Sequence, residues 1–445
     1  MGKFSNFLVI FKRELAAYFN SAIAYIFIII FVLLNGGLFM TQFFVVGRAD
    51  MRAFFAVLPL LLAVFLPAVS MRLWAEERKG NTQELLLTFP IETRDLILGK
   101  FAASFIFYLT ALAATLPIPV MLCFLGRPDM GGIIGGYIGA AFLGGLFLAI
   151  GILVSGFCRD QIVSFILSMM ICFGLYLIGT EFVASSLDGW ISGGGTFLRH
   201  FLGASDPYDA FAKGVIDTKN LFYFVLGTAV FLILNGFWLE GRMRPKARSI
   251  FTTAALLCAG IFLFSNWLLA GLPLGRFDLT EGRMYTLSTS TKKILKSLKT
   301  PAVAKLYISS SEKMPTSMKT LEQDIADKLD ELRIASGGKF QYKIFHMDVS
   351  EAVEKNKKKQ SQEESFEEQL SKKGIQPFQV QSIDADEMGV RLIYSGLTLS
   401  YKEKPEEILP RIHPGNFDSL EYMIISKLYR MTLAEAPKVA LVAPF

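Results

Sequence analysis

Residues 131–156 read GGIIGGYIGAAFLGGLFLAIGILVSG, a stretch that contains no charged residue. About 20 helical residues cross the hydrocarbon core of a bilayer, so this stretch is long enough to span a membrane. Six further apolar runs lie near residues 21–43, 54–71, 101–125, 161–184, 220–239 and 250–271. The sequence therefore predicts a polytopic α-helical membrane domain with seven spans.

Glycine recurs at four-residue spacing in the quoted stretch, at Gly131, Gly135 and Gly139. Small residues spaced in this way lie on one face of a helix and let a neighbouring backbone approach closely. Packing inside the bundle is one explanation of the pattern, and a dimer seam is the alternative. We therefore predict that these three glycines are helix-packing residues.

Charge is unevenly distributed along the 445 residues. Residues 1–271 contain 34 charged side chains, whereas the shorter part from 272 to 445 contains 50. The second part has the composition of a water-soluble domain, because such domains are roughly a quarter charged. This segregation excludes a single soluble enzyme and a disordered chain. The formal net charge of +6 is modest, so no nucleic-acid partner is expected.

Lys and Arg are concentrated in the loops on one side of the predicted spans, with 13 on that side and six on the other. The basic side of a membrane protein stays cytoplasmic. The N-terminus is therefore predicted to be cytoplasmic, and seven spans place the C-terminal domain outside the cytoplasm. In a bacterium this describes a multi-pass protein of the inner membrane with a periplasmic domain.

The first 18 residues have an amphipathic pattern, in which apolar side chains recur at helical spacing beside Lys12, Arg13 and Glu14. This pattern predicts a helix that lies on the membrane surface. A plain continuation of the first span is the alternative.

The longest predicted cytoplasmic loop, residues 72–100, contains EERKGNTQELLLTFP at positions 76–90. Asn81 and Glu84 have the spacing of a capping box, which predicts a helix start. Pro90 requires that this helix end before it, and Thr93 is expected to cap the next helix. A short helix with three adjacent leucines suits docking into a groove of a cytoplasmic partner. A solvated connector is the alternative.

The pattern Glu-Glu-Arg-x-Gly-x-Thr-x-Glu-Leu-Leu, then Pro, then Leu-Gly-Lys at 98–100, resembles the coupling segment of type-2 ABC exporter permeases. The resemblance covers roughly residues 1–240 and implies a surface helix, six spans, a homodimer and a separate ABC ATPase subunit. The family more often has Gly where this chain has Asn81. By this match the ATPase-coupling contacts are Glu76, Glu77, Arg78, Gly80, Thr82, Glu84 and Pro90.

A phosphate-binding loop requires glycines followed by Lys and then Ser or Thr. Gly99 and Lys100 are followed by Phe101, and Arg94 stands at the upstream glycine position. The chain is therefore not expected to be an ATPase or any other enzyme. No cofactor is expected in it, since ATP would be bound by the partner subunit. With three histidines and no Cys–His cluster, no metal site is predicted either.

The C-terminal part alternates predicted helices and strands, which is typical of an α/β domain. Helices are expected after Ser288 or Ser290 and near 317–335 and 417–432, and a solvated helix is expected over 351–373. Strands are expected at 303–308 and 340–346, and paired strands are expected at 389–401 and about 406–410. A last strand is expected to start at 438.

Three stretches of this part, Arg276–Ser288, Tyr394–Ser400 and Leu420–Leu428, resemble GldG-type auxiliary subunits, which partner GldF-type permeases. The resemblance implies a GldF-like and a GldG-like part fused in order, and hence a permease subunit of an ATP-driven export system. Gliding motility is implied by this resemblance alone. The predicted domains are a permease-like domain over 1–240, a basic loop with the seventh tethering span over 241–275, and an extracytoplasmic α/β domain over 276–445. Auxiliary subunits of this type are longer, so the last domain is expected to be incomplete.

Two other functions fit the sequence less well. A non-transporting scaffold would use the exported domain to bind envelope or motility components. A membrane-tethered hydrolase would need a catalytic cluster. His346 and Asp348 are near each other in the sequence, but without a recognisable motif we interpret them as structural residues.

Overall fold

The computed structural model describes the chain in two compact units. One comprises Met1–Phe44 and Ala49–Arg283, and the other comprises Val45–Arg48 and Met284–Phe445. The described residues are 3–46, 49–89, 91–126, 128–188, 190, 194–241, 247–270, 275–280, 286–310, 314, 318, 321–347, 370–371, 374–384, 387–402 and 404–433.

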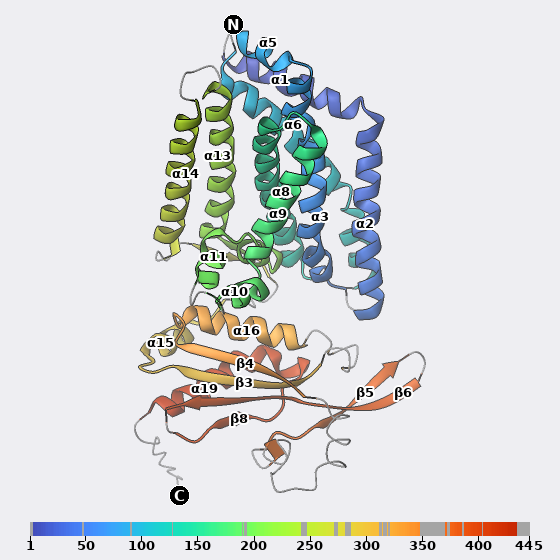
Figure 1. The fold of residues 1–445 in the computed structure, drawn as a ribbon. Coiled ribbons are helices and arrows are strands. Elements are labelled where there is room, and N and C mark those ends of the chain that lie inside the picture. Colours follow the sequence, from blue (N-terminus) through green and yellow to red (C-terminus); the bar gives the residue numbers. More distant parts are fainter. Residues whose placement is uncertain are drawn as a thin grey trace, which may run out of the picture. The chain divides into compact units, whose positions relative to one another are not determined.

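The first unit is a helical bundle (Figure 1). Its helices are α1 (Lys3–Phe19), α2 (Ala22–Val46), α3 (Arg52–Ser70), α4 (Arg72–Lys79), α5 (Thr82–Thr88), α6 (Thr93–Ala113), α7 (Pro117–Leu125), α8 (Met130–Phe157), α9 (Gln161–Ile178), α10 (Glu181–Asp188), α11 (Gly194–Leu202), α12 (Ser205–Ala212), α13 (Thr218–Gly241) and α14 (Ala247–Ala270).

Seven helical stretches in the described part of the chain are long and apolar enough to cross a membrane, which confirms the predicted polytopic fold. The fifth stretch ends at Ile178, so the prediction that it continues to residue 184 was wrong. Gly179 ends that helix and α10 starts a separate one at Glu181. The stretches are Ala22–Phe44, Arg52–Lys79, Thr93–Leu125, Met130–Phe157, Gln161–Ile178, Thr218–Gly241 and Arg248–Leu269.

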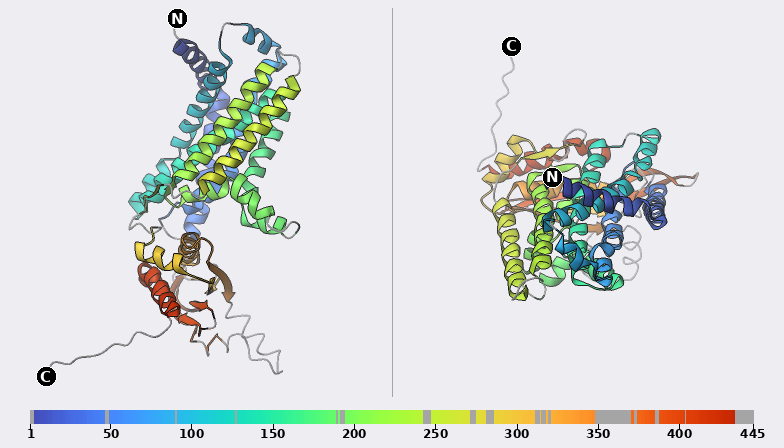
Figure 2. Two further views of the ribbon diagram at one scale, coloured as in Figure 1. Left: turned by 90° about the vertical axis from the view of Figure 1, so that its left-hand side faces the viewer. Right: turned by 90° about the horizontal axis from the view of Figure 1, so that it is seen from above.

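Helix α8, the quoted stretch, is the centre of the bundle. Its span is 83% buried inside the unit, whereas the last span, Arg248–Leu269, is only 6% buried. A helix that is apolar on every side is stable where other helices surround it, and α3, α9 and α13 pack against α8. Helix α14 packs on the outside of α13, and Figure 2 shows the two side by side.

Helix α1 is separate from the first span, because the helix breaks at Asn20 and Ser21. One face of α1 packs against α6: a Cβ added at Gly99 would lie 2.8 Å from the side chain of Ile10. Tyr18 is also buried, and its hydroxyl donates a hydrogen bond to the carbonyl of Val69 at 3.0 Å. The amphipathic segment is thus a helix attached to the bundle by its apolar face.

A short antiparallel ribbon belongs to the same unit. Strand β1 (Val215–Asp217) precedes α13 and pairs with β2 (Arg276–Asp278), which follows α14. The stretch that resembles GldG-type subunits therefore begins inside the unit that contains the spans.

The second unit is a mixed α/β domain, as predicted. Its four-stranded sheet has the order β4-β3-β7-β8, in which β3 and β4 are parallel and the other pairs antiparallel. Strands β5 and β6 form a separate hairpin. The elements are α15 (Thr289–Ser297), β3 (Ala302–Ser309), α16 (Leu321–Ala335), β4 (Phe340–Met347), β5 (Phe378–Asp384), β6 (Glu387–Ile393), β7 (Ser395–Tyr401), β8 (Glu407–Leu409), the 3₁₀ helix η4 (Pro414–Ser419) and α19 (Leu420–Thr432).

Helices α15, α16 and α19 contribute the apolar side chains that bury one face of this sheet, among them Leu295, Ile325 and Leu428. Ser288 caps α15 as expected, since its hydroxyl accepts a hydrogen bond from the Thr291 amide. The predicted pairing of residues 389–401 with a strand near 406–410 is confirmed by β7 and β8, but the prediction of one continuous strand over 389–401 was wrong, because the chain leaves the β5–β6 hairpin at Tyr394 before β7 joins the sheet. The helix predicted over 351–373, except residues 370–371, and the strand predicted from 438 lie outside the described residues.

Candidate functional site

The loop between the second and third spans forms two short helices joined by a tight turn. Helix α4 ends at Lys79, and α5 begins at Thr82 after Asn81, which has a left-handed backbone with φ of 56°. The predicted capping box is therefore wrong: a capping side chain requires an extended backbone, and the Asn81 side chain makes no capping hydrogen bond. Gly and Asn are the residues that adopt this conformation most readily.

The far end of α5 agrees with the prediction. The helix stops at Thr88, and Phe89 is extended before Pro90. The next cap differs, because Glu92 rather than Thr93 stands at the cap position of α6 and makes no side-chain cap bond. Both caps were misjudged from residue type alone, whereas backbone conformation decides whether such a side chain reaches an amide.

Lys100 forms the centre of a buried polar cluster beside this loop. The residue is only 1% exposed, and its Nζ donates to Glu14 Oε1 at 3.0 Å, Glu77 Oε1 at 2.8 Å and the Leu73 carbonyl at 2.9 Å. These contacts match the three donors of an ammonium group. The ammonium also lies 4.9 Å from the centre of the Trp74 ring. One side chain thus joins α1, α4 and α6.

Arg13 completes the charge balance of the cluster. It contacts Glu14, and its Nη2 lies 3.4 Å from Glu77 Oε1, so two cations meet two carboxylates. Burial by itself opposes the ionisation of Glu14, but the charges of Lys100 and Arg13 and their hydrogen bonds outweigh it and lower the pKa of Glu14. A buried charge is tolerated only when it is paired in this way.

Helix α4 is also fixed to the end of the central helix α8. The Ser155 hydroxyl accepts hydrogen bonds from the amides of Trp74 and Ala75, both at 3.0 Å, and donates to the Met71 carbonyl at 2.8 Å. Arg78 donates to the carbonyls of Gly156, at 3.2 Å, and Phe157. The last carbonyls of a helix have no partner within that helix, so these contacts satisfy groups that need one.

Six of the seven predicted coupling residues lie in the described part of the chain, and they fall into two groups. Glu77 and Arg78 face inward and hold α4 against α1, α6 and α8. Pro90 lies outside the described residues. The remaining residues are exposed on the outer side of the loop: Glu76, Gly80, Thr82 and Glu84, with the apolar side chain of Leu85 beside them.

Lys100, Glu14 and Ser155 were not predicted as site residues. The sequence held one signal, a lysine beside an apolar span and an acidic residue in the first helix. Nothing in the sequence, however, says that residues 86 positions apart meet.

The predicted packing glycines lie along α8 where other parts of the same chain approach. A Cβ at Gly135 would lie 2.5 Å from the carbonyl oxygen of Phe211, and one at Gly139 would lie 2.5 Å from the Phe211 side chain. A Cβ at Gly131 would lie 1.9 Å from the carbonyl oxygen of Leu279, just after β2. The close approach therefore involves α12 and the chain that follows β2.

In the α/β unit, His346 Nε2 lies 2.7 Å from Glu322 Oε1, which joins β4 to α16. Asp348 lies outside the described residues. Within the described ranges, no group of three or more His, Cys, Asp or Glu side chains is placed to hold a metal ion.

The seven spans make the chain a multi-pass membrane protein. Residues 11–179 match the ABC-2 family transporter proteins, and residues 281–400 match a domain of unknown function (DUF7088). The chain therefore carries an ABC-2 family transporter membrane domain followed by a domain of unknown function. No curated protein matches the chain.

The ABC-2 match includes every residue of the Lys100 cluster and of the α4–α8 contact. Domains of this family are membrane subunits that carry no ATPase of their own and normally work with an ABC ATPase, so the match supports a membrane permease role.

Proposed function

We propose that this chain is the permease subunit of an ATP-driven ABC-type export system, GldF/GldG-like in kind, whose separate ATPase binds the α4–α5 loop. The observation that carries the proposal is the two-sided arrangement of this loop. Glu77 and Arg78 fix its inner side to the bundle, whereas Glu76, Thr82, Glu84 and an apolar side chain remain exposed on its outer side. An exposed apolar and charged surface on a braced element suits a protein contact.

The geometry also explains how such a contact would act on the spans. Helix α4 continues α3 through Met71, so a displacement of the loop pulls on the second span. The Lys100 cluster ties α4 to α6 and α1, and Ser155 ties it to α8. Separating a buried charge from its partners is costly. A force from the ATPase would therefore move these helix ends together.

In this proposal the N-terminus and the loop are cytoplasmic, the protein lies in a bacterial inner membrane, and two copies pair with two ATPase subunits. ATP is bound and hydrolysed by the partner. The α/β unit is exported, where it would contact the substrate or envelope components. A role in gliding motility rests on the resemblance to GldG-type subunits alone.

The test is co-purification with the candidate ATPase encoded nearby, followed by measurement of ATP turnover with and without this chain. Glu84→Arg reverses an exposed charge of the proposed contact and is expected to weaken ATPase retention about tenfold. The matched control is Glu240→Arg, which reverses an exposed charge at the end of α13.

Retention and turnover that survive Glu84→Arg would show that the contact assignment is wrong. A monodisperse membrane protein that binds no ATPase would refute the permease proposal and favour a scaffold, whose α/β unit binds envelope or motility components without nucleotide turnover.

A further inference from the structure

Asn235 is a completely buried polar residue in α13, within about the last two turns before that helix ends at Gly241. Among the described residues, neither its Nδ2 nor its Oδ1 has a hydrogen-bond partner. Buried amide groups are almost always paired, because an unpaired one has lost the hydrogen bonds that it makes with water. An unpaired amide inside a membrane bundle therefore needs a physical reason.

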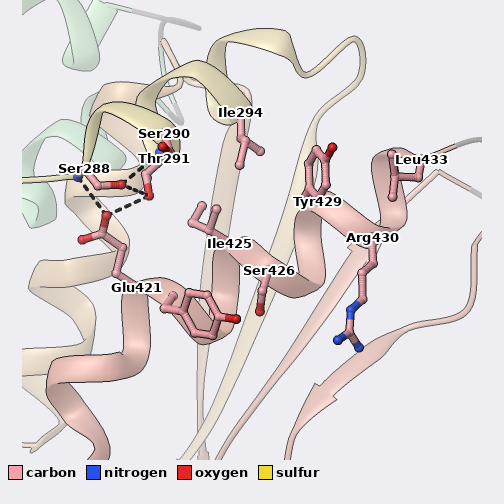
Figure 3. A pocket seen from close by; sticks show the side chains of 11 residues that line it. Ser288, Ser290, Thr291, Ile294, Glu421, Ile425, Ser426, Tyr429, Arg430 and Leu433 are labelled. Carbon is pink, nitrogen blue, oxygen red and sulfur yellow. Dashed lines mark hydrogen bonds between the residues drawn. The ribbon is translucent and has the colours of Figure 1, made fainter. Parts of the chain in front are cut away.

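Glu421 of the α/β unit shows the usual situation of a polar side chain that burial removes from water. Its Oε1 accepts hydrogen bonds from the Ser288 amide at 2.9 Å and the Thr291 hydroxyl at 2.8 Å (Figure 3). Its Oε2 lies 3.0 Å from Lys328 Nζ. Both carboxylate oxygens are thus paired within the unit. Asn235 has no such arrangement, although a suitable acceptor lies beside it.

That acceptor is the carbonyl of Gly156, near the end of α8. A Cβ built at Gly156 would lie 4.0 Å from Asn235 Nδ2 and 3.8 Å from Trp238 Nε1. The indole of Trp238 reaches the Gly156 carbonyl from this position, with Nε1 2.9 Å from the oxygen. The Asn235 amide is about as close to Gly156 as the indole is, but it makes no hydrogen bond to it.

The Gly156 carbonyl already has its full number of donors. A carbonyl oxygen has two lone pairs, and Arg78 Nη1 at 3.2 Å and Trp238 Nε1 at 2.9 Å use both. Arg78 belongs to α4, whereas Trp238 and Asn235 both belong to α13. Movement of α4 away from α8 would remove the Arg78 donor and leave one lone pair available beside the Asn235 amide.

We propose that Arg78 and Asn235 are alternative donors to the Gly156 carbonyl, and that Asn235 takes the place of Arg78 when α4 leaves the end of α8. With α4 attached, the unpaired Asn235 amide raises the free energy of the protein. With α4 released, the end of α8 and the Asn235 amide are paired with each other, and the Arg78 guanidinium is hydrated. Asn235 therefore lowers the free-energy cost of releasing α4, which keeps the released state within reach of a modest force. The source of that force, the ATPase, rests on the proposed function.

The test uses the full chain in phosphatidylcholine nanodiscs, without any ATPase. Hydrogen exchange of the α4 amides measures how often α4 leaves the bundle, and thermal unfolding measures the stability of the attached state. Asn235→Leu keeps the size of the side chain but removes its amide. It is expected to slow exchange of the α4 amides about tenfold and to raise the melting temperature by about 2–4 °C, because the attached state loses its unpaired group.

The same substitution should act differently when the Gly156 carbonyl has lost one of its donors. In Arg78→Met, Asn235 can pair with this carbonyl while α4 is still attached. Adding Asn235→Leu to Arg78→Met should therefore leave α4 exchange unchanged and lower the melting temperature. Trp238→Phe removes the other donor and keeps an aromatic ring beside Phe157, so it provides a second background in which Asn235→Leu should lower the melting temperature.

Asn35→Leu is the matched control. Asn35 is also buried in a span, in α2, but its Nδ2 already donates to the Phe31 carbonyl at 2.7 Å. Because Asn35 shares no acceptor with Arg78, its replacement should change the melting temperature equally in every background. None of these measurements involves the ATPase, so their failure is distinct from a failure of the permease proposal.

Three results would overturn the inference. A lower melting temperature for Asn235→Leu alone would show that Asn235 is already paired, for example with a buried water. Equal effects of Asn235→Leu in the unchanged protein and in the Arg78→Met and Trp238→Phe backgrounds would show that these side chains do not compete for one acceptor. Slower exchange in all helices alike would show that the substitution stabilises the bundle without affecting the release of α4.

Discussion

Replacing Lys100 with Met tests whether the buried cluster holds the α4–α5 loop to the bundle. Methionine keeps most of the apolar length of the lysine side chain but removes its charge and its three donors. Glu14 and Glu77 would then be left near each other, with Arg13 the one cation paired with them among the described residues. We expect the substitution to destabilise the membrane unit and to loosen α4 from α1.

The size of the effect follows from burial. Removing one partner of a buried ion pair costs about 3–5 kcal/mol. The side chains of Glu14 and Glu77 are 13% and 18% exposed, and Arg13 remains nearby, so we expect a loss at the lower end of this range. A loss of about 3 kcal/mol lowers the melting temperature by about 6 °C in a domain of this size.

The assay is thermal unfolding of the purified protein in one detergent, followed by intrinsic fluorescence. The variant Lys100→Met/Glu14→Gln/Glu77→Gln removes Lys100 and both carboxylates and leaves Arg13, whose side chain is 52% exposed. It is expected to recover about half of the loss, because neutral groups carry no penalty for an unpaired charge. The control Arg94→Met breaks an exposed pair with Glu92 and should change the melting temperature by no more than about 2 °C.

An unchanged melting temperature for Lys100→Met would refute the reasoning, since the cluster would then contribute nothing to the fold. A triple variant less stable than Lys100→Met would also refute it. That result would mean that the carboxylates have other partners and that charge balance is not what Lys100 provides.

Three further predictions concern the membrane unit. The pKa of Glu14 is lowered in the folded protein. The contribution of the Glu14 carboxylate to stability is therefore complete above pH 4.5, the ordinary pKa of the group, and is lost as the pH falls through the lowered pKa. Glu14→Gln should accordingly flatten the fall in melting temperature below about pH 5. Gly135→Ala should lower the free energy of unfolding by about 1–3 kcal/mol, because the new Cβ would clash with the Phe211 carbonyl. Gly174→Ala is the control, since a Cβ there meets open space and should leave the stability unchanged or raise it. Unfolding in denaturant measures both. Ser155→Ala removes three hydrogen bonds to the start of α4 and should lower the free energy of unfolding by about 1–3 kcal/mol. Faster amide exchange confined to α4 would support the role of Ser155 in holding that helix, and unchanged exchange would contradict it.

The membrane fold was predictable because its determinants are local. A span needs a run of apolar residues of fixed minimum length, since a bilayer offers no partner for exposed backbone groups. All seven runs were found for this reason. The ends of the runs were less certain: the fifth ends at Ile178, before Gly179, and such a helix end depends on the chain that follows it. In the α/β unit the alternation of helices and strands was equally local.

The candidate site was predictable in position but not in its internal arrangement. The loop and the end of α5 before Pro90 were predictable from the residues themselves, whereas the capping box predicted at the start of α5 was wrong. Which of its charged side chains face inward was not predictable. Glu76, Glu77 and Arg78 are adjacent in the sequence, and the inward position of Glu77 and Arg78 follows only from the neighbours that surround them in the fold.

By itself the sequence determined that this chain has seven helical stretches long and apolar enough to cross a membrane, an α/β domain after them, and a short helix in the loop after the second stretch. These features depend on hydrophobicity, helical period and proline, which act over a few residues. The tertiary structure alone decided that Lys100 meets Glu14 across 86 positions and that the α8 glycines face α12 and the chain after β2. Such contacts depend on which helices become neighbours, and that is set by the packing of the whole bundle.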